Sequence, residues 1–168
     1  NGVWAPIEEL SVDEWRNTID INLNGTFYTI KFSVPHMKER GGSIIVTASV
    51  NGTRMFSNSG ASAYATSKAG QVALTKMLAL ELAEYKIRVN VICPGAVMTE
   101  IMENTEKQQL QGVGWPANYP EGRVPLTGGG AGGPDQVARL VLFLASEDSD
   151  LITGTPIWID GAESLLQG

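Results

Sequence analysis

The sequence has few of the residues that bind metals or form covalent cross-links. Its 168 residues include a single histidine, His36, and a single cysteine, Cys93. One cysteine excludes an internal disulfide framework and is typical of a reducing compartment, so we expect a cytoplasmic protein. One histidine and one cysteine also provide no cluster of the ligands that zinc prefers. We expect His36 to lie on a helix surface and Cys93 to be a small buried side chain.

Positive charge and long apolar runs are also scarce. Lysine and arginine together number 12 against 18 aspartates and glutamates, and the net charge of −6 argues against binding to nucleic acids or anionic membranes. No apolar run approaches the roughly 18 residues that a membrane-spanning helix requires. The first residues, 1–4, lack the basic and apolar regions of a signal peptide. The length and the hydrophobic content of 43% suit one globular domain over residues 1–168.

Apolar periodicity predicts that helices and strands alternate along the chain. The first helix begins at a capping box, in which Ser11 and Glu14 satisfy each other's backbone donors. Short continuous apolar runs are typical of strands that are buried on both faces. The predicted helices are 11–40, with a break near 22–25, 62–85 and 134–145, and the predicted strands are 43–48, 87–92 and 155–159. This alternation indicates an α/β fold with a parallel sheet.

The most informative local pattern is a tyrosine, Tyr64, four residues before a lysine, Lys68, at the start of a predicted helix. Residues four apart share one helix face. A lysine ammonium favours the phenolate, so we expect the pKa of Tyr64 to fall from its ordinary value of about 10. Such a tyrosine can exchange a proton with an alcohol or carbonyl oxygen. Taken alone, the pattern is more often a pair on a solvated helix face.

Three further polar residues lie at informative positions. Ser49 follows the apolar strand 43–48, where α/β sheets usually carry their ligand-binding groups, although a serine can also simply end a strand in a turn. Asn22 and Asn24 lie in a helical stretch, for which asparagine is poorly suited. A local bond from the side chain to the backbone explains such residues equally well, and we prefer that explanation for Asn24.

Five regions, in this order, resemble motifs of the short-chain dehydrogenase/reductase family over nearly the whole chain. They are Asn1-Gly2-Val3, similar to the end of an N-N-A-G element; Ile21-Asn22-Leu23-Asn24-Gly25, similar to the stretch with the catalytic asparagine; residues 42–49, similar to the fifth strand with its catalytic serine; Tyr64 with Lys68; and residues 90–99, similar to the sixth strand and its P-G segment. Residues 134–146 and 152–161 resemble the family's last helix and strand.

The resemblance implies an enzyme of a defined type. It implies a Rossmann-like, doubly wound parallel sheet, of which residues 1–168 form the C-terminal part as a single domain and whose N-terminal strands are missing from this chain. It implies an oxidoreductase that transfers a hydride between NAD or NADP and a secondary alcohol or ketone. Small-molecule substrates, rather than nucleic acid or membrane, are the expected partners, along with further copies of the chain.

The resemblance also implies a role for each catalytic residue. Tyr64 would be the general acid/base, and Lys68 would lower the Tyr64 pKa and hold the nicotinamide ribose. Ser49 would hydrogen-bond the reacting oxygen. Asn22 would anchor a water molecule in a proton relay. The residues implied for cofactor binding are Asn1, Tyr64, Lys68, Pro94, Gly95, Val97 and Thr99, with Pro94 and Gly95 letting the backbone pass close to the ring.

The choice between NAD and NADP would be made upstream of this sequence, together with the glycine-rich phosphate turn. Gly128–Gly133 contains a G-x-G-x-x-G pattern, but no strand precedes it, so we interpret it as a flexible approach to the next helix rather than a phosphate site. The alternative hypothesis is a non-enzymatic fragment or scaffold that cannot bind the dinucleotide.

Association and substrate choice remain expectations from the same resemblance. A homodimer or homotetramer is implied, formed through the helices at 11–40 and 62–85. The loops at 50–60 and 100–133 would set the substrate. Trp115 and Tyr119 lie in the second loop, where contact with substrate and plain loop packing are equally compatible with the sequence. Trp158, in the last predicted strand, is expected in the core or at a subunit contact.

Overall fold

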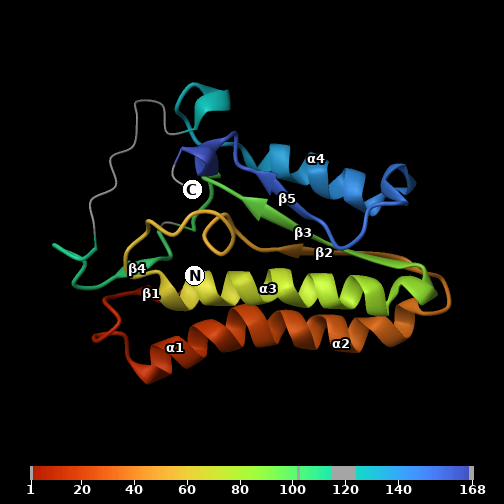
Figure 1. Ribbon diagram of the computed structural model, residues 1–168, viewed down its shortest axis with the longest axis horizontal. Helices are drawn as coiled ribbons and strands as arrows, with labels where there is room; N and C mark the ends of the chain where they lie inside the picture. Colours follow the sequence, from red (N-terminus) through yellow and green to blue (C-terminus); the bar gives the residue numbers. More distant parts are fainter. Residues whose placement is uncertain (1, 102, 115–123, 167–168) are drawn as a thin grey trace.

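The computed structural model describes residues 2–101, 103–114 and 124–166 of the chain (Figure 1). A parallel sheet of three strands lies at its centre, with helices on both faces. The strands, in their order across the sheet, are β2 (Gly42–Thr47), β3 (Ile87–Pro94) and β5 (Pro156–Ile159). The predicted α/β class and parallel sheet are therefore confirmed, with strand bounds within one or two residues of those expected.

The pairing of the strands puts their carboxyl ends at one edge of the sheet. Val46 of β2 lies opposite Val91 of β3, and Ile92 of β3 lies opposite Ile157 of β5. The loops after β2 and β3 therefore leave the sheet side by side, which is where open α/β sheets bind their ligands. Among the residues that the structure describes, β2 has a paired strand on one side only.

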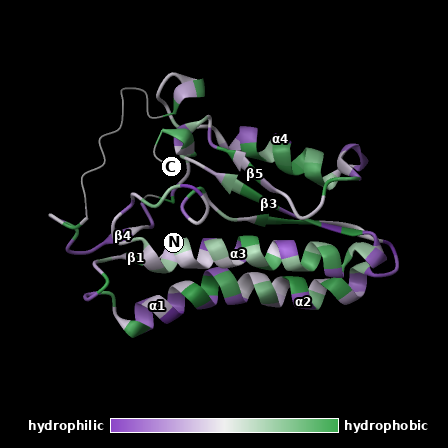
Figure 2. Ribbon diagram, in the orientation of Figure 1, coloured by the Kyte–Doolittle hydropathy of each residue, from purple (hydrophilic) through white to green (hydrophobic). Residues whose placement is uncertain are grey.

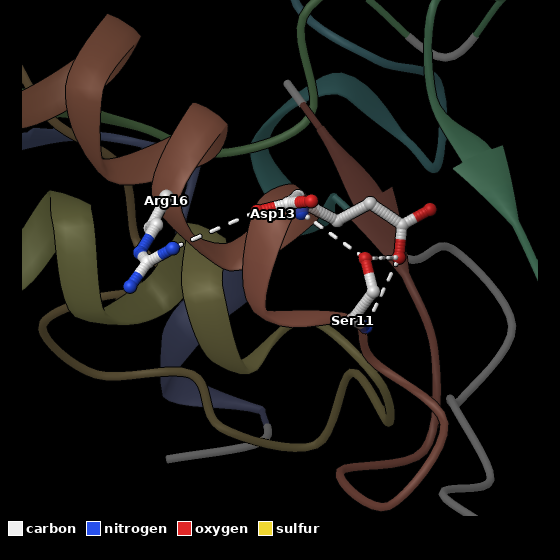
Figure 3. Close-up of polar contacts among 4 residues, drawn as sticks. Ser11, Asp13 and Arg16 are labelled. Carbon is white, nitrogen blue, oxygen red and sulfur yellow. Dashed lines mark hydrogen bonds and ion pairs between the residues drawn. The ribbon is translucent and has the colours of Figure 1, made fainter.

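The first helical region begins as expected. The Glu14 N–H donates to the Ser11 hydroxyl at 3.2 Å, and the Ser11 N–H donates back to the Glu14 carboxylate at 3.1 Å, so the capping box is complete (Figure 3). Asp13 and Arg16 form an exposed ion pair at 3.7 Å, which adds little stability because water screens both charges. The capped helix is α1 (Val12–Ile19).

The expected break in this helix is a short π-helical segment, Asp20–Asn24, after which the chain continues as α2 (Gly25–Met37). Such segments are rare and often lie at functional sites. The turn after α2 closes at Gly41, whose φ of 73° is a left-handed conformation that glycine adopts at little cost. The Gly41 N–H donates to the Met37 carbonyl at 2.8 Å.

The long helix α3 (Ser62–Glu81), extended by a 3-10 turn at Ala83–Tyr85, covers the same face of the sheet as α2 (Figure 1). Hydrophobic residues recur along the strands and both helices of this layer (Figure 2). Their side chains pack together in one cluster. The buried members of the main cluster are Ile30, Val46, Ala48, Val91 and Cys93. Cys93 is fully buried and His36 is exposed, as expected.

The opposite face of the sheet is covered by α4 (Pro134–Ala145). Leu144 is fully buried there, and the Ser43 hydroxyl of β2 donates to the Leu144 carbonyl at 2.7 Å. Short 3-10 turns at Pro125–Thr127, Glu147–Ser149 and Glu163–Leu165 complete this half of the chain. Within the described part of the chain, no helix is both long and apolar enough to cross a membrane.

One pairing was not expected from the sequence. β1 (Val3–Trp4) pairs in parallel with β4 (Glu106–Lys107), apart from the main sheet. The loop after β2 reaches the same region, because the Ala5 N–H donates to the Gly60 carbonyl at 3.2 Å. These contacts bring the start of the chain beside the first turn of α3.

Candidate active site

A cavity of about 680 Å³ opens at the carboxyl edge of the sheet. Three groups of residues line it: the end of β2 with the loop that follows, the first turns of α3, and the segment after β3. Among these are Ser49, Tyr64, Lys68 and all residues from Pro94 to Thr99. The structure thus brings together most of the residues that the sequence singled out.

Ser49 and Tyr64 line the cavity together, and the Ser49 side chain is near enough to the Tyr64 hydroxyl to favour its phenolate. Ser49 leaves the end of β2, and Tyr64 lies in the first turn of α3, so the contact joins the sheet to the helix that covers it. Both residues are only 8% exposed. The ring of Trp4 lies tilted against that of Tyr64, with 6.4 Å between the ring centres, and closes the site on another side.

The pKa of Tyr64 differs from the sequence expectation. Burial raises this pKa above its ordinary value, and the hydrogen bond from Ser49, which favours the phenolate, offsets only part of the rise. The expected fall in the Tyr64 pKa is therefore wrong for the protein in this state. The reason is that removing a phenolate from water costs more than one hydrogen bond returns.

Lys68 lies one turn further along α3, on the same face as Tyr64. Its Nζ is 5.6 Å from the centre of the Tyr64 ring and donates a hydrogen bond to the Thr47 carbonyl at 2.8 Å. Burial lowers the Lys68 pKa to about 8, because the ammonium is partly removed from water. Lys68 is thus still largely protonated at neutral pH. It loses its proton more easily than an exposed lysine does.

Asn22 lies against α3 rather than at the cavity wall. Its side-chain amide donates to the Ser67 hydroxyl at 3.0 Å, and Ser67 in turn donates to the Tyr64 carbonyl at 2.7 Å. The backbone carbonyl of Asn22 accepts hydrogen bonds from the Thr26 hydroxyl at 2.7 Å and from the Gln71 side-chain amide at 2.9 Å. The π-helical segment is therefore tied to the helix that carries Tyr64 and Lys68.

Asn24 forms a local contact, as expected, but with a side chain instead of the backbone. Its amide donates to the Asp20 carboxylate at 2.6 Å.

The segment from Pro94 to Thr99, including Val97, lines the cavity as the resemblance implies. The structure gives a reason for a glycine at position 95 in addition to the expected one. A Cβ on Gly95 would lie 2.6 Å from the Glu163 Oε2 atom and 2.7 Å from the Asp160 Cβ atom, so glycine is required by the C-terminal segment. Asn1, Trp115 and Tyr119 lie outside the described residues.

Two features of the site were missed from the sequence. Glu163 is buried at the cavity wall, and its carboxylate accepts the Ala96 N–H at 2.6 Å. The segment Gly128–Gly133 also has more than a connecting role. Gly132 exchanges backbone hydrogen bonds, each of 2.9 Å, with Ala96 and Met98. No local sequence pattern indicates either contact, because both join segments that are far apart in the chain.

The side chains of the site can hold and move a proton but form no metal centre. In residues 2–101, 103–114 and 124–166, no group of three or more His, Cys, Asp or Glu side chains is arranged to hold a metal ion. The polar side chains that line the cavity carry hydroxyl, amide, ammonium and carboxylate groups, and they belong to Thr47, Ser49, Asn51, Asn58, Tyr64, Lys68, Thr99, Thr105, Lys107 and Glu163. This donor set suits an organic ligand with hydroxyl and carbonyl oxygens.

Comparisons with known proteins agree with this arrangement. The pattern of the family described as Enoyl-(Acyl carrier protein) reductase matches residues 2–162. Trans-4-hydroxycyclohexanecarboxylate dehydrogenase of Sinomonas cyclohexanicum is 40% identical over 158 residues, which cover 94% of this chain and 55% of that enzyme. The chain therefore spans little more than half the length of this relative.

Solved structures give the same result at the level of the fold. A 3-ketoacyl-ACP reductase from Sinorhizobium meliloti 1021 superposes with a TM-score of 0.92 at 46% identity, covering 99% of this chain and 66% of that one. A 3-oxoacyl-(acyl-carrier protein) reductase with bound NAD from Brucella melitensis superposes with a TM-score of 0.77 at 34% identity, covering 96% and 56%. Since a family pattern spans almost all of the sequence and these relatives share its fold, the chain belongs to the short-chain dehydrogenase/reductase family.

Proposed function

We propose that the chain carries the catalytic centre of an NAD(P)-dependent oxidoreductase that acts on a secondary alcohol or the corresponding ketone. The observation that carries the proposal is that Ser49, Tyr64 and Lys68 line one cavity, with the Lys68 Nζ atom 5.6 Å from the centre of the Tyr64 ring. Family membership and relatives named as dehydrogenases and reductases support it. The cofactor is NAD or NADP.

The residues at the cavity fit the nicotinamide end of such a cofactor. The Lys68 ammonium has three N–H donors, of which Thr47 takes one, so the others are available to ribose hydroxyls. The Thr99 hydroxyl and the Val97 backbone are suited to a carboxamide, which has both donors and acceptors. The nicotinamide, when bound, supplies or accepts the hydride.

Tyr64 is the general acid/base of the proposed reaction. In the reducing direction its hydroxyl gives a proton to the carbonyl oxygen, and in the oxidising direction its phenolate takes the proton of the alcohol. Burial raises the Tyr64 pKa, which keeps the hydroxyl protonated at neutral pH and suits the acid role. The base role needs the Lys68 cation, because a neighbouring positive charge favours the phenolate.

Ser49 and Asn22 have supporting roles in the proposal. Ser49 donates a hydrogen bond to the reacting oxygen and so holds it beside the Tyr64 hydroxyl. Asn22 anchors a water molecule in a relay that returns protons to Lys68 from solvent. The support for Asn22 is its hydrogen bond to Ser67, the residue before Lys68 in α3.

The cavity wall favours a substrate with an apolar body. Trp4, Met55, Met98 and Ile101 line it together with the polar groups of the catalytic residues. Met55 is almost completely buried, so it forms a fixed part of this wall. We propose an uncharged or weakly polar ring or chain next to the reacting carbon, held by burial of apolar surface.

We also propose a single domain over residues 1–168 that acts in the cytoplasm as a homodimer or homotetramer. Large apolar side chains that are exposed on α2 and α3 support association through these helices. They are Phe27, Tyr28, Phe32, Met77 and Leu80.

The experiment compares the native protein with Tyr64→Phe, using Tyr28→Phe as a control at an exposed position on α2. NADH and NADPH binding is followed by fluorescence, and turnover is measured with a panel of cyclic secondary alcohols. Tyr64→Phe should lower turnover by about 10²- to 10⁴-fold, because it removes the hydroxyl that exchanges a proton with the substrate oxygen. Full turnover by Tyr64→Phe would refute the mechanism, and no cofactor binding by the native protein would favour the scaffold alternative.

A further inference from the structure

Glu163 is a buried acid at the wall of the proposed active site. Only 1% of its surface is exposed, and it lies in the 3-10 turn Glu163–Leu165 near the end of the chain. It lines the same cavity as Ser49, Tyr64 and Lys68. A carboxylate is costly to bury unless hydrogen bonds satisfy it, so its contacts indicate what it does there.

The carboxylate of Glu163 contacts the backbone of the segment from Pro94 to Thr99. Its Oε2 atom accepts the Ala96 N–H at 2.6 Å. The same oxygen occupies the space that a side chain at position 95 would need. Gly95 and Glu163 are therefore complementary, and the carboxylate fixes the peptide between residues 95 and 96.

The turn that carries Glu163 is itself held firmly. The Asp160 carboxylate accepts the Ala162 N–H at 3.2 Å and the Ser164 N–H at 3.0 Å, as well as the Ser164 hydroxyl. Burial raises the Asp160 pKa, but these hydrogen bonds lower it by more than burial raises it. The Asp160 pKa therefore lies below its ordinary value. The Glu163 N–H donates to the Asp160 carbonyl at 3.0 Å, so Glu163 projects from a braced turn.

The opposite side of the Ala96 peptide is held by the glycine-rich segment. The Gly132 N–H donates to the Ala96 carbonyl at 2.9 Å, and the Met98 N–H donates to the Gly132 carbonyl at 2.9 Å. Val97 and Gly132 form an isolated parallel bridge. Both the N–H and the carbonyl of Ala96 are therefore hydrogen-bonded. Ala96 directly precedes Val97 and lies close to Thr99, the two residues that the proposed function assigns to cofactor binding.

We propose that Glu163 is a positioning residue that, through the Ala96 N–H, holds the segment from Pro94 to Thr99 in the shape that receives the nicotinamide. This inference rests on the proposed function. Glu163 does not act on the reacting atoms. It restricts the segment to fewer conformations before a ligand binds. Less conformational entropy is then lost when Val97 and Thr99 contact the ligand.

The test distinguishes the length of the side chain at position 163 from its charge. Glu163→Gln keeps an acceptor oxygen at the same distance, whereas Glu163→Asp keeps the charge but is one methylene too short to meet Ala96. The dissociation constant for NADH, measured by fluorescence, should rise about tenfold in Glu163→Asp and stay within about threefold in Glu163→Gln. Leu165→Ala, at an exposed position in the same turn, is the control and should bind as the native protein does.

Hydrogen exchange of the Ala96 amide supplies a readout that does not depend on the cofactor. Exchange should be about tenfold faster in Glu163→Asp than in the native protein and nearly unchanged in Glu163→Gln, in proteins whose melting curves show that they are folded. Equal NADH binding by the native protein and Glu163→Asp would overturn the inference while leaving the proposed function intact. Absence of both NADH and NADPH binding by the native protein would overturn the inference and the proposed function together.

Discussion

The Lys68 Nζ atom lies 2.8 Å from the carbonyl oxygen of Thr47, and this hydrogen bond joins the first turns of α3 to the end of β2. The contact fixes the position of the ammonium relative to the Tyr64 ring, whose centre is 5.6 Å away. It therefore sets the relative positions of Lys68 and the proposed acid/base, Tyr64, before any ligand binds.

The partly buried Lys68 ammonium should give the protein a defined pH dependence of stability. Its pKa is about 8 in the folded protein and 10.5 in the ordinary reference state. Between these values the unfolded chain binds more protons than the folded one, so the contribution of Lys68 to the free energy of unfolding rises with pH in that window. Below pH 8 the full penalty for burying the charge is present.

Lys68→Met removes this titration. The free energy of unfolding of the native protein minus that of Lys68→Met should rise between about pH 8 and pH 10.5 and be flat below pH 8, as measured by urea unfolding. Lys76→Met changes an exposed lysine on the same helix and is the control. Parallel stability curves for the native protein and Lys68→Met would contradict the burial of the ammonium.

The raised pKa of Tyr64 can be measured directly. The difference in ultraviolet absorbance between the native protein and Tyr64→Phe isolates the phenolate of this residue during a pH titration. Its midpoint should lie above the ordinary tyrosine value of about 10, because burial outweighs the hydrogen bond from Ser49. Ser49→Ala should move the midpoint higher still, and a midpoint near 7 would refute this account.

A glycine holds the loop after β2 against α3. A Cβ on Gly52 would lie 2.6 Å from the Ala69 nitrogen and 2.8 Å from the Lys68 Cβ atom. Gly52→Ala should therefore lower the free energy of unfolding by about 1–3 kcal/mol, since backbone atoms would have to move. Gly130→Ala meets open space and should stay within about 0.5 kcal/mol of the native protein. Equal effects of the two changes in chemical denaturation would be inconsistent with this close approach.

Asn22 and Asn24 belong to the same short segment but should differ in their contribution to stability. Asn22→Ala removes a partly buried bond to Ser67 that connects two helices, whereas Asn24→Ala removes an exposed local bond to Asp20. We expect Asn22→Ala to be the more destabilising change by about 1 kcal/mol, measured by thermal or chemical unfolding. The reverse order would show that the π-helical segment is not anchored through Ser67.

The sequence predicted the features that depend on neighbours along the chain. The strand at Gly42–Thr47 and the helix at Pro134–Ala145 follow from local apolar patterns and helix signals, and both appear within one or two residues of the expected bounds. The shared face of Tyr64 and Lys68 follows from their four-residue spacing. Such features need no knowledge of how distant segments meet.

What the sequence did not predict depends on tertiary contacts. Glu163 reaches Ala96 across 67 positions, and only the turn at Asp160 brings it there. The Tyr64 pKa follows from burial, which the spacing to Lys68 does not reveal. The two-residue strands Val3–Trp4 and Glu106–Lys107 are too short to produce a periodic pattern.

The single-sided pairing of β2 has a geometrical consequence for the cavity. A polypeptide segment that docks in parallel along the free backbone of Gly42–Thr47 must finish at the same edge as Ser49, because all the strands of a parallel sheet point the same way. Whatever follows that segment then becomes a neighbour of the reactive hydroxyls. Within residues 2–101, 103–114 and 124–166 this side of β2 has no strand partner, so its exposed backbone donors and acceptors are open to such pairing.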